Sequence, residues 1–393
     1  MTNNGSKGSR GSKGSKGIVL AVVLGSVFGA HAQSPWRQAE AGYQYSFPRD
    51  HAAHPENKIE WWYYTGNVKT ADGRRFGFQV TFFRVGIDYK PANPSQWAVR
   101  DLYMTHLAVS DAKGQRYRFA EKLSRGGPGL AGARSDRYYV WNDDWSAGIK
   151  EPGAGTREPG AVRTHVLHAL SPQAGIDLTL DEGKPPAING VNGISQKGAR
   201  EGNASHYYSL TRMPTKGTID VDGEKFEVAG ETWMDHETGT SFLEPEQQGW
   251  DWLSIQMSDH RELMLYRLRR GDGSRDPRSS GTLVDANGKT THLTNDDFTL
   301  TPGAKTFKSP NGAVYPTEWK VSIPSQKIDL TVTTPLQDQE LSLVKSTGIA
   351  YWEGMIDVTG QASGPAGRQA ITGVGYLEMT GYHGSLGRVL SGQ

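Results

Sequence analysis

The chain has 393 residues and contains no cysteine. This absence excludes disulfide bonds, iron–sulfur clusters and thiolate-bound zinc. The sequence also lacks the Gly-x-Ser-x-Gly elbow, the Walker phosphate loop, the Gly-x-Gly-x-x-Gly motif and the His-Glu-x-x-His motif. Common hydrolase, nucleotide-binding and zinc-protease chemistries are therefore unsupported. Without cross-links the fold depends on its core, which a chain of this length can bury.

An excess of charge of either sign is also missing, because 43 Lys and Arg stand against 42 Asp and Glu. Residues 1–32 carry four of the basic residues and no acid, so the remainder has 39 basic and 42 acidic residues. Such a balance gives no electrostatic footprint for nucleic acid. We therefore expect no nucleic-acid partner.

The first 32 residues have the pattern of a secretory signal peptide. A basic segment precedes an apolar run at 18–30, and Ala30-His31-Ala32 provides a small-x-small cleavage site. The run is shorter than the roughly 20 residues that a spanning helix needs. An uncleaved anchor is the alternative, which the polar residues after Ala32 disfavour. We predict cleavage after Ala32, export to the periplasm or the medium, and no stable membrane insertion afterwards.

Long runs with helical hydrophobic periodicity are absent as well. Short aromatic and β-branched runs, such as "EWWYYTGNV" (60–68) and "RFGFQVTFFRV" (75–85), are bounded by Gly, Pro, Asn and Asp instead. Asp72-Gly73, Asp222-Gly223 and Asn287-Gly288 are favoured hairpin turns. The pattern predicts an all-β chain of antiparallel strands that form sandwiches or closed barrels.

The length and a faint internal echo indicate two domains. The stretch at 54–68 resembles that at 351–360, since each places a Trp beside an acid at a strand start. Duplication would produce this echo, although convergent strand chemistry gives similar ones. We predict an N-terminal domain at 33–245 and a C-terminal domain at 246–393.

The first candidate for chemistry is the strand that begins at Glu60. Side chains alternate between the two faces of a strand, so Glu60, Trp62 and Tyr64 should share one face. A carboxyl group between aromatic rings is desolvated, which raises its pKa and suits it to general acid catalysis. The alternative is a barrel wall in which Glu60 bonds to backbone or to an arginine.

The second candidate is "ETWMDHETG" (231–239), where acids and a histidine adjoin. Alternation places Trp233, Asp235 and Glu237 on one face and His236 on the other. This split argues against a metal site, which would need two histidines and a carboxylate to converge, so we expect no metal and no cofactor. Asp235 or Glu237 can donate a proton while His236 orients or accepts. The alternative is a buried Asp–His network that fixes the domain junction.

The third candidate is a pair of aromatic strands at 250–257 and 262–270. Trp250, Trp252 and Gln256 should share a face, and Tyr266 should lie on the next strand. Flat aromatic rings with a few polar groups are what a pocket for an apolar ligand needs, although an ordinary core needs them too.

These stretches resemble the lipocalin-like AttH/carotenoid 1,2-hydratase family, together with "GVGYLEMTGY" (373–382). The resemblance covers residues 54–382 and implies two lipocalin-like antiparallel β-barrel domains packed side by side. The hydratase branch of the family protonates an alkene and adds water. His236 matches a histidine of that branch, whereas Thr238 and Leu268 stand where a Trp and an Asp are expected. Both departures favour the AttH-type branch over carotenoid hydration.

We therefore predict an exported protein that binds an apolar small molecule, such as a lipid, terpenoid or polyketide. If it is an enzyme, acid-assisted hydration, isomerisation or cyclisation is expected. A non-catalytic carrier and a carotenoid 1,2-hydratase are the alternatives. The catalytic candidates are Asp235, His236 and Glu237. The predicted ligand-binding residues are Glu60, Trp62, Tyr64, Trp233, Trp250, Trp252, Gln256 and Tyr266.

Overall fold

The computed structural model describes residue 1 and residues 34–150, 162–240, 243–343, 346, 348–364 and 367–386. The predicted signal peptide and its cleavage site therefore lie outside the described residues, apart from Met1. The described chain is all-β, as predicted, and its helical elements are the two 3-10 turns η1 (Arg49–His51) and η2 (Pro324–Gln326). Over the same residues, no helix has the length and apolar character to cross a membrane.

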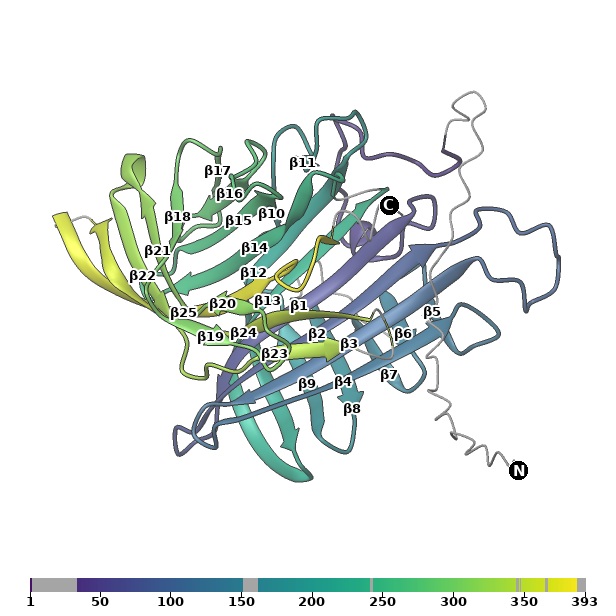
Figure 1. Cartoon of the computed structure of the whole chain (residues 1–393), viewed down its shortest axis with the longest axis horizontal. Helices are drawn as coiled ribbons and strands as arrows, with labels where there is room; N and C mark the ends of the chain where they lie inside the picture. The colour runs from purple at the N-terminus through teal and green to yellow at the C-terminus, as the bar shows by residue number, and fades with distance from the viewer. Residues whose placement is uncertain are drawn as a thin grey trace.

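The N-terminal half forms an antiparallel sheet of 13 strands, whose main path runs β4-β3-β2-β1-β13-β12-β9-β8-β7-β6-β5. The sheet curls until β4 contacts β6 and β9, which makes a nearly closed barrel (Figure 1). Its strands are β1 (Ile59–Lys69), β2 (Arg75–Gly86), β3 (Asp101–Asp111), β4 (Arg116–Arg125), β5 (Ala131–Ala133), β6 (Tyr139–Asn142), β7 (Trp145–Ile149), β8 (Thr164–Leu170), β9 (Ala174–Asp181), β10 (Ala187–Ile188), β11 (Ser195–Gln196), β12 (Ala204–Val221) and β13 (Glu224–Gly239).

The C-terminal half forms a second antiparallel sheet of 10 strands, ordered β17-β16-β15-β14-β25-β24-β22-β21-β18 with β23 beside β24. Its strands are β14 (Gln247–Met257), β15 (Glu262–Arg270), β16 (Ser280–Val284), β17 (Thr290–Leu293), β18 (Thr299–Pro302), β21 (Glu318–Ile323), β22 (Ile328–Thr333), β23 (Glu340–Leu343), β24 (Ile349–Gly364) and β25 (Gly367–Met379). A small hairpin of β19 (Thr306–Lys308) and β20 (Val314–Pro316) completes it. The chain passes from the first sheet to the second between Gly239 and Gln247. The division of the chain into two domains stays a prediction.

The turn signals of the sequence lie where the hairpins form. The β12–β13 turn has positive φ at both Asp222 and Gly223, 57° and 83°, which is the conformation that two-residue hairpins favour. Gly73 and Gly288 also have positive φ, 88° each, between the paired strands β1–β2 and β16–β17. Local turn chemistry thus sets the register of these three hairpins.

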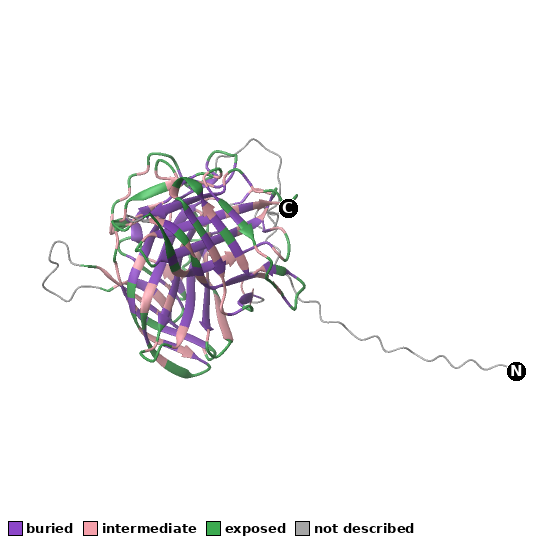
Figure 2. Ribbon diagram, turned by 90° about the vertical axis from the view of Figure 1, so that its left-hand side faces the viewer, coloured by how far each residue is buried: buried purple, intermediate pink, exposed green. Residues whose placement is uncertain are grey.

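The described residues form four apolar clusters, of which the three largest fill the two halves and join them. One fills the N-terminal barrel and includes Trp62 and Phe78, and another lies on the C-terminal sheet around Trp319. The third joins the two sheets and contains Tyr63 from β1 and Trp252 from β14. Buried residues accordingly run along the strands of both sheets, and exposed ones gather at the hairpin tips (Figure 2). The two faces of β1 therefore serve two different cores.

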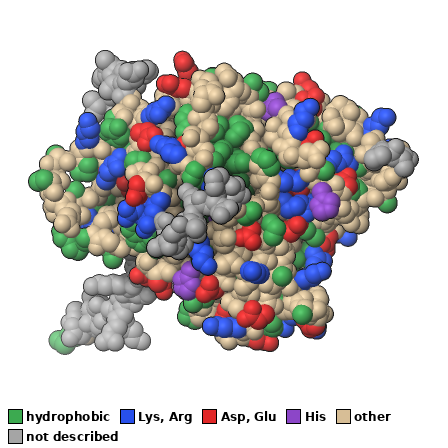
Figure 3. Space-filling model, turned by 180° about the vertical axis from the view of Figure 1, so that it is seen from behind, with side chains coloured by type: hydrophobic (Ala, Val, Ile, Leu, Met, Phe, Trp, Pro, Cys, Tyr) green, Lys and Arg blue, Asp and Glu red, His purple; other side chains and the backbone are tan. Residues whose placement is uncertain are grey.

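Basic and acidic side chains are mixed over the surface shown in Figure 3, with apolar side chains between them. This distribution matches the nearly balanced charge of the chain.

Close approach of the two sheets depends on a glycine in β2. A Cβ atom on Gly77 would lie 2.8 Å from Cβ of Met355 in β24 and 2.8 Å from the hydroxyl of Tyr376 in β25. We expect Gly77→Ala to lower the free energy of unfolding by about 1–3 kcal/mol, because overpacking forces the sheets apart. Gly271→Ala is the matched control, since its Cβ would meet nothing nearer than 4.0 Å. Urea unfolding of both variants checks this, and equal stabilities would contradict it.

Candidate active site between the two sheets

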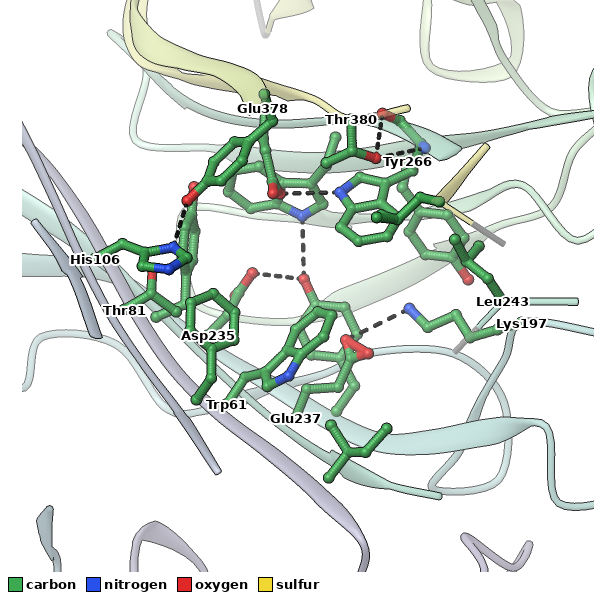
Figure 4. A pocket seen from close by; sticks show the side chains of 18 of the residues that line it. Trp61, Thr81, His106, Lys197, Asp235, Glu237, Leu243, Tyr266, Glu378 and Thr380 are labelled. Carbon is green, nitrogen blue, oxygen red and sulfur yellow. Dashed lines mark hydrogen bonds and ion pairs between the residues drawn. The ribbon is translucent and has the colours of Figure 1, made fainter. Parts of the chain in front are cut away.

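A cavity of about 300 Å³ lies where the two sheets face each other (Figure 4). One wall comes from β1, β2, β3, β12 and β13, and the other comes from β14, β15, β24 and β25. Aromatic side chains from both sheets dominate the lining. They are Trp61, Tyr63, Phe83, Tyr207, Trp250, Trp252, Tyr266 and Tyr351.

Strand alternation explains which residues reach this cavity from the N-terminal sheet. Trp61 pairs with Glu237 across the β1–β13 ladder, and Tyr63 pairs with Asp235. All four side chains line the cavity. Because alternate residues share a face, their neighbours along each strand point into the barrel instead.

Asp235 is held in one position by three donors. Oδ1 accepts hydrogen bonds from Trp233 Nε1 at 2.6 Å and Ser209 Oγ at 2.5 Å, and Oδ2 accepts one from the Tyr207 hydroxyl at 2.6 Å. Trp252 Nε1 in turn donates to the Tyr207 oxygen at 3.2 Å, which extends the network to the second sheet. Burial raises the pKa of Asp235 to about 7, although the three hydrogen bonds oppose this shift. The carboxyl group is therefore both oriented and able to exchange a proton near neutral pH.

The second sheet contributes a pair of glutamates. Glu353 in β24 and Glu378 in β25 are direct partners across the ladder, and both line the cavity. Burial, together with the neighbouring Glu378, raises the pKa of Glu353 well above its ordinary value. Burial also raises the pKa of Glu378 to about 7, against a hydrogen bond of 3.0 Å that Trp250 Nε1 donates to Oε2. Because two adjacent buried carboxylates repel each other, we expect the pair to hold a proton at neutral pH.

The Glu353 carboxyl has polar neighbours from the opposite wall. Oε1 of Glu353 and the Tyr63 hydroxyl are both buried, and Tyr63 and Gln79 lie close enough to Glu353 to oppose the rise in its pKa. His106, on the same wall, bonds to the Tyr351 hydroxyl at 2.9 Å, and burial lowers its pKa to about 3. That imidazole is neutral at physiological pH, so the carboxyl groups are the better proton donors of this cavity.

The glutamate pair makes stability depend on pH. A carboxyl whose folded pKa is raised stabilises the fold fully below its unfolded pKa and loses that contribution as the pH rises through the folded value. For Glu378 these values are 4.5 and about 7. We expect the free energy of unfolding to fall by on the order of 3 kcal/mol between about pH 5 and pH 8. Glu378→Gln should flatten this fall in urea titrations, and an unchanged slope would contradict the assignment.

Lys197 and Glu237 form an ion pair at the other end of the cavity. Lys197 Nζ lies 3.5 Å from Glu237 Oε2, and 4.2 Å and 4.9 Å from the ring centres of Tyr266 and Tyr207. Burial opposes the charge, but the Glu237 carboxylate outweighs it and holds the pKa of Lys197 above its ordinary value. The lysine is therefore a cation within an aromatic wall.

The structure places His236 apart from Asp235 and Glu237, the two residues with which it was predicted to act. His236 lies on the opposite face of β13, inside the N-terminal barrel, and its ring stacks on Trp62 with centroids 5.1 Å apart. Its Nδ1 lies 2.9 Å from the Asp50 carbonyl oxygen. Since the backbone of β13 separates this imidazole from the cavity, it cannot share protons directly with its two neighbours.

Glu60, Trp62 and Tyr64, which were predicted to bind a ligand, also lie inside the barrel and do not line the cavity. Trp61 and Tyr63, on the other face of β1, occupy the cavity wall in their place. The alternation of the sequence had separated the two sets correctly. It did not indicate which face met the cavity.

Glu60 belongs to a buried ionic network. Oε2 accepts hydrogen bonds from Arg84 Nε at 3.2 Å and Nη2 at 3.1 Å, and Arg84 Nη1 donates to Asp101 at 3.0 Å. The backbone N–H of His54 donates to both carboxylate oxygens at 3.0 Å. These contacts match the alternative interpretation of the sequence, a barrel wall in which Glu60 bonds to backbone or to an arginine.

The same network is where the described residues could hold a metal ion, because ligand atoms of His54, Glu60 and His236 lie within 4.8 Å of one another. His54 Nδ1 lies 2.9 Å and His236 Nε2 3.0 Å from Oε1 of Glu60. The other imidazole nitrogens face Asp50, which bonds the His236 ring through its carbonyl oxygen and lies 3.4 Å from His54 through its carboxylate. Contacts within the protein account for every ligand atom, so we assign these residues to the polar core of the barrel.

The remaining predicted residues divide between the cavity and its support. Trp250, Trp252 and Tyr266 line the cavity. Trp233 orients Asp235, as described above. Gln256 Nε2 donates to the carbonyl oxygens of Thr211 at 2.9 Å and Thr232 at 3.3 Å, which ties β14 to the N-terminal sheet.

Sequence reasoning did not single out Glu353, Glu378, Lys197 or Tyr207. A signal existed for the two glutamates, because alternation places Tyr351 with Glu353 and Tyr376 with Glu378 on one face of their strands. Lys197 follows the short strand β11 and carries no periodic signal.

The two family departures lie on different strands, Leu268 on β15 and Thr238 on β13. Leu268 lines the cavity, so an apolar group occupies the position where the resemblance implies an Asp. Thr238 shares the barrel-facing side of β13 with His236, and its hydroxyl has no hydrogen-bond partner among the described residues. Any acid chemistry in this chain must therefore use other carboxyl groups.

Comparisons with known proteins identify relatives of the whole chain. A family model described as AttH-like matches residues 38–382. A protein of Nitrosomonas europaea proposed to be AttH is 31% identical, with a TM-score of 0.76, over 88% of this chain and 99% of its own. Kievitone hydratase from Nectria haematococca is 17% identical, with a TM-score of 0.64, over 88% of this chain and 96% of its own. CghA is 11% identical, with a TM-score of 0.51, over 83% and 90%. The last two likenesses concern the fold alone, and no curated protein matches.

Proposed function

Because this chain belongs to the AttH-like family, we propose that it binds an apolar small molecule between its two lipocalin-like sheets and transfers a proton to it. The observation that carries this proposal is the pair Glu353 and Glu378. Two carboxyl groups stand in register in an aromatic cavity, where burial raises the pKa of Glu353 well above its ordinary value and that of Glu378 to about 7. A carboxylic acid that stays protonated at neutral pH is suited to protonate carbon.

Hydration of an alkene illustrates the chemistry that this arrangement allows. A carboxyl proton is transferred to one alkene carbon, and the electron pair of the double bond forms the new C–H bond. The other carbon becomes cationic and is stabilised by the faces of nearby aromatic rings, of which Trp61 and Trp252 are examples. Water attacks that carbon and returns a proton to the carboxylate, so the protein is regenerated. Loss of a different proton gives isomerisation, and attack by a second alkene of the same molecule gives cyclisation.

Asp235 supports this reaction from the opposite wall. Its three hydrogen-bond donors favour the carboxylate form, which suits it to accept a proton or to stabilise a nearby cation. The fold is compatible with such a role, since kievitone hydratase, a hydratase by name, shares it. Binding without turnover is the alternative, and the same cavity favours it, because an enclosed aromatic site retains an apolar molecule without any reaction.

Deuterium incorporation separates these two functions. The protein is purified from its native host, and the molecule that it retains is identified by mass spectrometry. The free molecule is then incubated with the protein in deuterium oxide. We expect deuterium on carbon, because hydration, isomerisation and cyclisation all begin with transfer of a solvent-exchangeable proton. A retained molecule that gains no deuterium and is returned unchanged would establish the carrier function, and a chain that emerges without any apolar molecule would contradict both.

A further inference from the structure

The Lys197–Glu237 pair bears on the chemical class of the ligand. Lys197 is 7% exposed and projects into the cavity at the end away from Glu378 (Figure 4). Its backbone is fixed on both sides, because its N–H donates to the Asn203 carbonyl at 2.9 Å and its own carbonyl accepts from Gln247 Nε2 at 2.8 Å. The position of the ammonium group is therefore built into the fold.

The ammonium group is poorly satisfied where it lies. It carries three N–H donors. Within the described chain its one hydrogen-bond acceptor is Oε2 of Glu237, at the long distance of 3.5 Å, and its other contacts are the aromatic rings of Tyr207 and Tyr266. A buried charged donor without acceptors is costly unless another group meets it. An oxygen atom of the ligand would fill this role.

The charge of the cavity decides which kind of oxygen fits. Glu237 balances Lys197, and Asp235 adds a further carboxylate when ionised. An anionic ligand beside Lys197 would therefore face two carboxylates at close range. A neutral carbonyl oxygen accepts a hydrogen bond from the ammonium group without that repulsion, and a hydroxyl group nearby can donate to Glu237.

We propose that the ligand is a neutral, oxygenated apolar molecule whose carbonyl oxygen is bound by Lys197, while its hydrocarbon part lies against the aromatic walls. The proposal rests on the proposed function, because it uses the same cavity. It separates the expected ligand from unsubstituted hydrocarbons, which offer the ammonium group no acceptor besides Glu237, and from carboxylates, which Glu237 repels. Lys197 thus acts as a specificity-determining residue.

Three probes of one shape test this proposal. 2-Acetylnaphthalene carries a carbonyl group, 2-isopropenylnaphthalene replaces its oxygen by CH₂, and 2-naphthoate is the anion. Their affinities are measured by displacement of the neutral fluorophore N-phenyl-1-naphthylamine. We expect the ketone to bind about 10-fold tighter than the alkene, the value for one hydrogen bond to a charged group, and also tighter than the anion.

Lys197→Met should abolish the preference for the ketone and leave the affinity of the alkene unchanged. Lys216→Met, at an exposed position of β12, is the matched control. Since Lys197→Met leaves Glu237 unpaired, the double variant Lys197→Met/Glu237→Gln keeps the test valid if the single variant unfolds. Equal affinities of ketone and alkene in the parent protein, or a preference for the anion, would overturn this inference alone. A cavity that binds neither the fluorophore nor any probe would overturn the proposed function as well.

Discussion

Replacing Glu378 by glutamine is expected to lower the rate of deuterium incorporation by roughly 10²–10⁴-fold, the usual contribution of a positioned general acid. Glutamine has the shape of glutamate and can still accept the hydrogen bond from Trp250 Nε1, but it cannot donate a proton to carbon. Binding of the retained molecule should change little, because the aromatic wall is intact. The loss should therefore fall on turnover and leave affinity almost unaffected.

Two further variants identify the proton donor. Glu227→Gln, at an exposed position of β13, is the control and should react like the parent protein. Asp235→Asn tests the opposite wall. If Glu378→Gln reacted normally while Asp235→Asn were inactive and folded, the proton donor would be Asp235 and the assignment to the glutamate pair would be wrong.

Replacing Arg84 by methionine is expected to have the largest effect on stability. Its guanidinium is 1% exposed and bonds to Glu60 and Asp101, so the substitution removes one partner of a buried ion pair and leaves the Glu60 carboxylate with His54, 2.9 Å away, as a remaining basic neighbour. Loss of one partner of a buried ion pair costs about 3–5 kcal/mol. Thermal or urea unfolding should show a loss of this size, or no folded protein at all.

A double-mutant cycle separates the charge effect from the loss of packing. In Glu60→Gln/Arg84→Met the buried charge of Glu60 is removed as well, so the double variant should be more stable than Arg84→Met alone. Arg134→Met removes a solvent-exposed partner of Asp136 and should change stability little. A double variant as unstable as the single one would show that Arg84 contributes by packing and not by charge.

Local patterns of the sequence predicted much of this architecture. The all-β class and the three hairpin turns follow from β-branched and aromatic runs and from Asp-Gly and Asn-Gly pairs, which need no tertiary information. The alternation in β1 and β13 was also predicted, because a period of two is a property of the extended backbone.

The site could not be completed from the same patterns. Alternation tells which residues share a face, but it does not tell what that face meets, so it could not show that Trp62 and His236 lie inside the barrel and not at the cavity. Glu353 and Glu378 come together only through the pairing of β24 with β25. Lys197 reaches the cavity only because β11 pairs with β12 beside it. Each of these depends on long-range pairing, which a single sequence does not display.

Strand β13 acts as a shared partition, with the polar core of the barrel on one side and the cavity on the other. His236 and Asp235 are consecutive on its backbone, so a displacement of either side chain is passed to the other through a single peptide unit. If a His236 variant lost turnover, a displaced Asp235 would explain the loss as well as a direct catalytic role of His236 would. A residue of this chain can therefore be essential without contacting a ligand. Measuring the ligand affinity of variants on each side of β13 distinguishes residues that contact the ligand from residues that act through the strand.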